Sequence, residues 1–137
     1  MAHFFDVNAH CYSGGTEATA LFPKVLETLI SIGFEAIPLT NEPNPIYAIK
    51  FAAIQQPIIG FSKVTNHKLN PSTDFIAVMT CSQADADCPL VFGADKRISL
   101  PYDDPKAFDN IAIQTDKYLA TSTLIAKEMK YVFSQIQ

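Results

Sequence analysis

Two stretches of the chain repeat apolar residues with the period of an amphipathic helix. In the first, the apolar positions run from Leu21 to Ile30, Pro23 suits a first-turn position, and Gly33 supplies the stop. The second begins at Ala112 and keeps the helical period to the end of the chain, which predicts a long terminal helix. Most of the predicted strands lie between these two helices.

Short apolar runs bounded by turn residues predict the strands. The run Phe75–Thr80 is typical of a buried strand, because it is apolar almost throughout. The runs Ile46–Phe51 and Ile58–Ser62 are separated by a Gln-Gln-Pro turn, which favours an antiparallel pair or a hairpin. The remaining strands are expected at Ala9–Tyr12, Phe34–Leu39 and Arg97–Leu100, and an acidic loop with a helical turn at Pro101–Asn110. The alternation of strand and helix indicates an α/β fold.

The composition excludes several classes of protein. With 137 residues, 48% of them hydrophobic, the chain is expected to form a single domain, residues 1–137, with a hydrophobic core. A net charge of −4 without a basic cluster argues against nucleic-acid binding. No apolar run approaches the roughly 20 residues of a membrane span, and the start lacks the features of a signal peptide. Three cysteines are too few for a secreted disulfide framework, so a cytoplasmic location is expected.

Two of the cysteines, Cys81 and Cys88, directly follow the buried strand and lie seven residues apart. In open α/β sheets, ligands gather outside the carboxyl ends of the strands. If the linking segment were one helix, the thiols would share a face about 10.5 Å apart along the axis, whereas a disulfide needs Cα atoms within about 7 Å. The pair is therefore a candidate redox switch whose oxidation rearranges its own backbone. The alternative is two small buried hydrophobes, against which the intervening Ser, Gln and Asp residues argue.

Three segments occur in an order that is characteristic of a known family: Ser13–Ala18, Thr80–Pro89 and Tyr102–Pro105. In these segments the chain resembles the thioredoxin-coupled arsenate reductases, which have the fold of the low-molecular-weight protein tyrosine phosphatases. The resemblance covers the chain from Ala9 to its end, with Asn41–Lys68 similar to an insertion found in a longer branch of the family. The double-cysteine segment is the specific part of this resemblance.

The resemblance implies a thiol–disulfide relay. In that family a cysteine of a Cys-(five residues)-Arg loop attacks arsenate, a second cysteine attacks the first as arsenite leaves, and a third resolves the bond. Thioredoxin then reduces the final disulfide. By position, Cys81 resembles the second cysteine and Cys88 the third. Asp104, just before Pro105, matches the general acid of the phosphatases, although an aspartate in this place is also an ordinary turn residue.

The first cysteine of such a relay has no counterpart in the sequence. The single arginine is Arg97, and the position six residues before it is Val91. Cys11 is interpreted as a strand cysteine. The resemblance makes Met1–Asn8 the end of a helix and implies that the central strand and the oxyanion loop precede it. The expected fold is thus a three-layer, open parallel sheet without its first, central strand and with an inserted β-hairpin.

This expected fold leaves strand edges unpaired, which predicts a homo-oligomer or an altered strand pairing. The expected function is that of an arsenate reductase-like protein with a thioredoxin-like reductant. Arsenate or a phosphate-like oxyanion would be its substrate only with the missing loop, so the chain alone is predicted to be inactive. The alternatives are a tyrosine phosphatase-like hydrolase and a non-catalytic redox or interaction module with a reversible dithiol. No cofactor is expected, and a metal site drawn from His10, Cys11, Cys81 and Cys88 lacks the spacing of known zinc sites.

Overall fold

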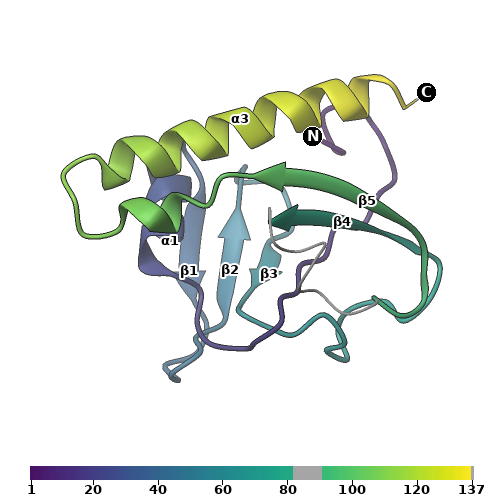
Figure 1. Ribbon diagram of the computed structural model, residues 1–137, viewed down its shortest axis with the longest axis horizontal. Coiled ribbons are helices and arrows are strands. Elements are labelled where there is room, and N and C mark those ends of the chain that lie inside the picture. The colour runs from purple at the N-terminus through teal and green to yellow at the C-terminus, as the bar shows by residue number, and fades with distance from the viewer. Residues whose placement is uncertain (82–90, 137) are drawn as a thin grey trace. The chain divides into compact units, whose positions relative to one another are not determined.

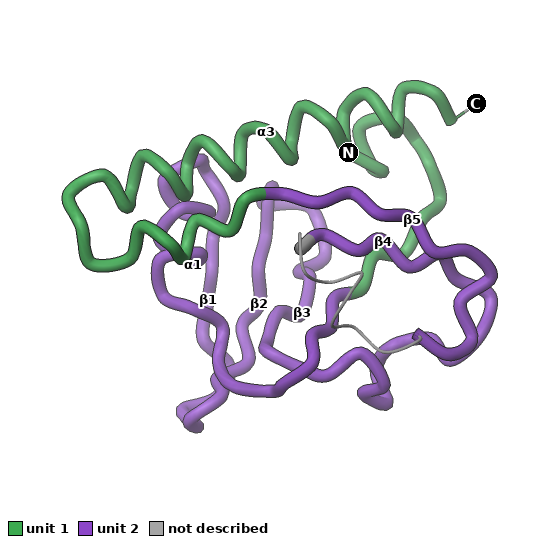
Figure 2. The backbone as a smooth tube through the Cα atoms, viewed as in Figure 1, with its two compact units in different colours: residues 1–12, 103–137 green, residues 13–102 purple. Residues whose placement is uncertain are grey.

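The computed structural model describes residues 1–81 and 91–136, which divide into two compact units (Figure 2). One unit consists of residues 13–102. The other combines residues 1–12 with residues 103–137. Both ends of the chain therefore belong to the same unit, and in the sequence residues 13–102 separate its two segments.

The helix α1 (Pro23–Ser31) opens the regular structure of the unit of residues 13–102. Pro23 occupies its first turn, where the missing N–H costs no hydrogen bond. Gly33 has a φ of 98° and accepts the left-handed conformation that ends the helix. The predicted helix and its stop are confirmed.

Three short strands of the same unit form an antiparallel meander with the second strand in the middle (Figure 1). Ala48 of the central strand pairs with Ile37 on one side and Ile59 on the other, and it is buried. The antiparallel pair predicted for Ile46–Phe51 and Ile58–Ser62 is confirmed. The strands are β1 (Glu35–Pro38), β2 (Tyr47–Lys50) and β3 (Ile58–Gly60).

Pro38 ends the edge strand β1 in a position that suits a residue without an N–H. The N–H of the next residue, Leu39, donates to the carbonyl of Ile46 at 2.7 Å and therefore faces β2. Successive residues of a strand point their N–H groups to opposite edges, so the nitrogen of Pro38 faces away from β2. Proline is tolerated there because it removes no hydrogen bond of the sheet.

The two longest strands, β4 (Phe75–Cys81) and β5 (Ala94–Tyr102), run parallel to each other (Figure 1). One face of β4 is covered, because Ala77 and Met79 are buried. On the opposite face Ile76 is 58% exposed. Alternate burial of this kind follows from the two-residue period of a strand. The small core cluster consists of Ala77 and Met79, with Phe75, Val91 and Ala94 packed against them.

The protein is therefore an α/β protein whose described strands form two sheets, one antiparallel and one parallel. The strand predicted at Phe34–Leu39 is present, but it pairs antiparallel with β2 and does not join a parallel sheet. The prediction of a strand at Ala9–Tyr12 is wrong. These residues are exposed and find no partner strand among the described residues, and the first backbone pairing comes at Gly15, which bridges to Val64.

The unit that holds both chain ends contains the short helix η1 (Pro105–Phe108) and the long helix α3 (Gln114–Ser134). The Lys117 Nζ lies 4.6 Å from the centre of the Phe108 ring and so connects the two helices. Asp109, just after η1, accepts hydrogen bonds of 2.8 Å from both Gln114 Nε2 and the Tyr118 hydroxyl of α3. The predicted helical turn and the predicted terminal helix are confirmed.

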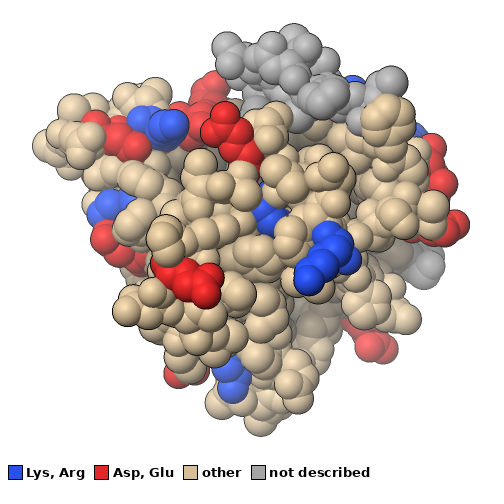
Figure 3. Space-filling view, turned by 90° about the horizontal axis from the view of Figure 1, so that it is seen from below, with Lys and Arg blue, Asp and Glu red and all other residues tan. Residues whose placement is uncertain are grey.

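Charged side chains lie scattered among uncharged ones on the face that Figure 3 shows. The described residues of this face form no continuous basic patch. Within the described part of the chain, no helix combines the length and the apolar character that crossing a membrane requires.

Tyr118 gives the stability a defined dependence on pH. Its side chain is buried, and burial, the hydrogen bond to Asp109 and the charges of Asp109 and Asp104 raise the pKa of Tyr118 to about 12. The folded pKa of Tyr118 lies above the unfolded value of about 10, so the protonated hydroxyl stabilises the folded state. This contribution to the free energy of unfolding is fully present below pH ~10 and is lost as the pH rises to about 12.

We expect Tyr118→Phe to lower the free energy of unfolding by about 1–2 kcal/mol at neutral pH, because a charge-assisted hydrogen bond is lost. Urea unfolding across the pH range measures the effect, and the deficit should shrink between pH ~10 and ~12. Tyr131→Phe, at a tyrosine that is 68% exposed, is the matched control and should change little. A deficit that stays constant over this range would contradict the assigned hydrogen bond.

Candidate functional site

Cys81 is the last residue of β4, at the carboxyl edge of the parallel pair. Its Cα pairs with that of Tyr102, which is the last residue of β5, so both strands end together. The position that the sequence predicted for Cys81, at the end of a strand, is confirmed. Such an edge is where parallel α/β sheets place their ligands and reactive groups.

A bulge precedes this edge. Met79 pairs with Ser99 but Cys81 pairs with Tyr102, so β5 holds one residue more than β4 over this stretch. Pro101 lies in the extra length of β5, where proline without an N–H is tolerated. Bulges re-aim the strand residues that follow them and are frequent beside functional sites. The backbone at Cys81 is therefore distinct from a regular strand end.

Cys88, the second member of the predicted dithiol, lies outside the described residues. Of the two relay positions the structure thus places the backbone of Cys81. The pairing of these two cysteines stays a prediction.

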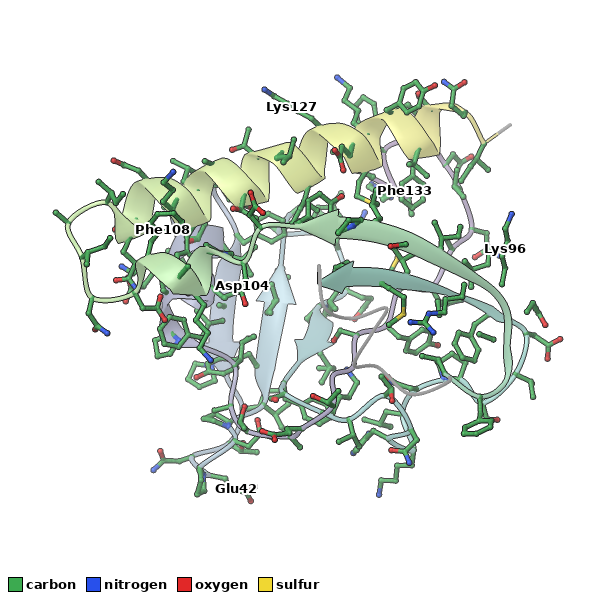
Figure 4. The ribbon with its side chains drawn as sticks, viewed as in Figure 1. Glu42, Lys96, Asp104, Phe108, Lys127 and Phe133 are labelled. Atoms are coloured by element: carbon green, nitrogen blue, oxygen red, sulfur yellow. The ribbon has the colours of Figure 1, made fainter. Side chains whose placement is uncertain are left out.

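Asp104, the predicted general acid, directly precedes η1 as its N-cap residue and belongs to the other compact unit (Figure 4). Its Oδ1 accepts the backbone N–H of Lys106 at 2.9 Å, while Pro105 takes the first position of the helix. The side chain is exposed to solvent. This is the geometry of a helix-capping aspartate, so Asp104 has a structural role whether or not it also transfers a proton.

Cys11 does not lie in a strand, and that prediction is wrong. It is a free, exposed cysteine in an irregular segment of the unit of residues 1–12 and 103–137. A strand needs a partner for its backbone groups, and this segment has none among the described residues. Within the same part of the chain, no three His, Cys, Asp or Glu side chains gather closely enough to hold a metal ion.

Sequence reasoning missed a buried lysine in the unit of residues 13–102. Lys63 is only 8% exposed, and burial lowers the pKa of its ammonium group. Its Nζ donates to Ser13 Oγ at 3.2 Å and lies 5.0 Å from the centre of the Phe61 ring. Among the described residues, no carboxylate lies within the 4.0 Å of an ion pair with Lys63. A buried cation without a counter-charge is uncommon, because burial removes its hydration.

Backbone hydrogen bonds fix the loop that carries Ser13 against the segment that carries Lys63. Gly15 N–H donates to the Lys63 carbonyl at 2.9 Å, and Thr65 N–H donates to the Gly15 carbonyl at 3.0 Å. Gly14 must remain a glycine for this approach, because a Cβ there would lie 2.7 Å from the Thr65 Cα.

Asn70 completes this arrangement. Its Nδ2 donates to the Ser13 carbonyl at 3.1 Å and to the Thr65 carbonyl at 3.0 Å. Its Oδ1 is buried and has no hydrogen-bond partner among the described residues. We name Ser13, Lys63 and Asn70 the Ser13–Lys63 cluster. In the sequence, Ser13 stood out only as the start of the segment Ser13–Ala18, and Lys63 stands in a segment without a distinctive pattern.

Comparison with known proteins assigns the chain to no group. No family model matches it, and no curated protein or solved structure is similar to it at a significant level.

Proposed function

We propose that the protein is an arsenate reductase-like thiol–disulfide relay protein, with Cys81 and Cys88 as the relay pair and a thioredoxin-like protein as its reductant. The observation that carries the proposal is the position of Cys81 at the carboxyl edge of the parallel pair β4–β5. The resemblance of Thr80–Pro89 to the relay segment of that family supplies the second cysteine. The proposal includes the low-molecular-weight phosphatase type of fold, with which a parallel strand pair ending in a cysteine is compatible.

The relay chemistry needs only the two thiols and an exchange partner. Oxidation by a small disulfide joins the two sulfur atoms and converts that disulfide to two thiols. In the reverse direction, a thiolate of the thioredoxin-like protein attacks one sulfur and forms a mixed disulfide. The second thiol of the thioredoxin-like protein then attacks the mixed disulfide and releases the relay protein. The relay protein regains both thiols, and the thioredoxin-like protein becomes a disulfide.

The 137-residue chain is not expected to reduce arsenate by itself. The family's first step needs a cysteine nucleophile in a loop whose arginine clamps the oxyanion. The sole arginine, Arg97, instead lies within β5, where it pairs with Ala77. Cys11 precedes no arginine at the required spacing. Asp104 would act as a general acid only where such a loop presents a leaving group.

Mild oxidation of the purified chain tests the relay. We expect oxidised glutathione to produce a Cys81–Cys88 disulfide, identified by peptide mass spectrometry, which thioredoxin and its reductase then reduce with consumption of NADPH. Cys11→Ser is the matched control and should retain the cycle, because Cys11 belongs to the other unit and has no assigned role. Cys88→Ser should abolish it.

Two results would contradict this proposal. One is a disulfide that involves Cys11 in the wild-type chain under the same conditions. The other is a Cys81–Cys88 disulfide that thioredoxin leaves intact. Arsenate-dependent NADPH consumption by the wild-type chain would overturn the expectation that the chain is inactive alone.

A further inference from the structure

We infer that the Ser13–Lys63 cluster is a binding site for a small tetrahedral oxyanion, of which inorganic phosphate is the simplest. The site lies wholly within the unit of residues 13–102 and uses neither Cys81 nor Cys88. It therefore stands independently of the proposed thiol chemistry.

The ammonium group of Lys63 has donors to spare. A lysine carries three N–H donors, and the described residues provide one acceptor, the Ser13 hydroxyl at 3.2 Å. The Phe61 ring, 5.0 Å away, faces the charge but accepts no conventional hydrogen bond. An anion bound at Nζ would supply both the missing acceptors and the counter-charge that the described residues lack.

The two groups of the cluster that would contact an anion differ in their exposure. Ser13 is exposed whereas Lys63 is buried, so the hydroxyl is the more accessible of the two. Both groups can donate to the same anion, because a hydroxyl rotates to suit its partner. The limited exposure of Lys63 favours a compact ligand over a peptide carboxylate, which would bring a bulky chain with it.

The cluster is held in place before any ligand arrives. The Asn70 amide nitrogen is committed to the Ser13 and Thr65 carbonyls, and Gly15 is hydrogen-bonded on both sides to the segment of Lys63. Little ordering is then needed on binding. The remaining Asn70 Oδ1 is a buried acceptor that finds no donor among the residues that the structure describes. A protonated oxygen, such as that of hydrogen phosphate, or a water held beside the ligand would satisfy it.

Isothermal titration of the full chain with inorganic phosphate at constant ionic strength tests the site. We expect saturable binding by the wild-type chain and at least a tenfold weaker affinity in Lys63→Met, which keeps the apolar stem but removes the charge. Ser13→Ala should weaken binding severalfold. Lys24→Met is the matched control, because Lys24 is already paired with Glu27 on α1, and it should bind as the wild type does. Cys81→Ser should also bind normally, whatever the outcome of the redox experiment.

Binding that is absent in the wild-type chain, or equal in Lys63→Met and the wild type, would overturn the inference. If Lys63→Met fails to fold, the exposed Ser13 still decides, because Ser13→Ala must weaken binding without loss of structure. Amide chemical shifts provide a separate readout in the wild-type chain. Phosphate should move the resonances of Gly14, Gly15 and Thr65, and shifts confined to other segments would place the ion elsewhere and refute the site.

Discussion

Gly93→Ala should disrupt the parallel pair β4–β5 and lower the free energy of unfolding by more than about 3 kcal/mol, because it combines steric overlap with backbone strain. A Cβ at this position would lie 1.8 Å from the Ser72 carbonyl oxygen and 2.8 Å from its carbon. Both are backbone atoms, so no side-chain rotation relieves the overlap. Gly93 also has a φ of 82°, which a residue with a Cβ rarely adopts. To relieve the overlap, the backbone at Ser72 would have to move away from residue 93. This movement would also separate Phe75 from its partner Ala94.

Gly33→Ala is the matched control for this substitution. Gly33 has a similar φ of 98°, but nothing lies within 4 Å of a Cβ built there. Gly33→Ala should therefore lower the free energy of unfolding by about 1 kcal/mol, which is the cost of the backbone strain alone. Urea unfolding of the two variants separates the contributions. Equal losses of stability would contradict the close approach of Gly93 to Ser72.

Met79→Ala should cost about 2–4 kcal/mol of unfolding free energy, because it removes the larger of the two buried side chains in the core cluster. Ile76→Ala is the matched control on the same strand. Ile76 points to the opposite face and is 58% exposed, so its truncation should cost less than about 1 kcal/mol. Ile76→Ala also removes a β-branched residue, so it loses at least as much strand propensity as Met79→Ala, and a larger cost for Met79→Ala therefore reports lost packing. A larger loss for Ile76→Ala, in the same unfolding measurement, would show that the other face of β4 is the covered one.

The local elements could be predicted from the sequence because their causes are local. Pro23 and Gly33 mark the two ends of α1, and the apolar run Phe75–Thr80 marks β4. What a strand pairs with depends on connections that an apolar pattern does not reveal. The strand at Phe34–Leu39 was expected in a parallel sheet, but the turn after it folds back. The Asn44 side chain fixes that turn by donating to the Ser62 carbonyl at 2.7 Å.

For the candidate sites too, local features could be predicted from the sequence, whereas contacts between distant residues could not. The end of β4 at Cys81 followed from the strand pattern, and a helical turn was predicted within the acidic loop Pro101–Asn110, which holds η1. The burial of Lys63 could not be foreseen, because its partner Ser13 is 50 residues away in sequence. A lysine in a polar segment is usually a solvated one, and only the folded chain shows that this one is not. The relay role of Cys88 stays a prediction, and so does the role of Asp104 as a general acid.

The proline that ends β1 also limits how this protein can associate with other molecules. A strand arriving from a neighbouring molecule would need alternating N–H donors along the outer edge of β1, and Pro38 withholds one of the few that so short a strand has. Continuous growth of the meander from this side into an intermolecular sheet, the first step toward fibrous aggregates, is thereby opposed. The pyrrolidine ring of Pro38 thus protects the outer edge of β1, which no other strand among the described residues covers.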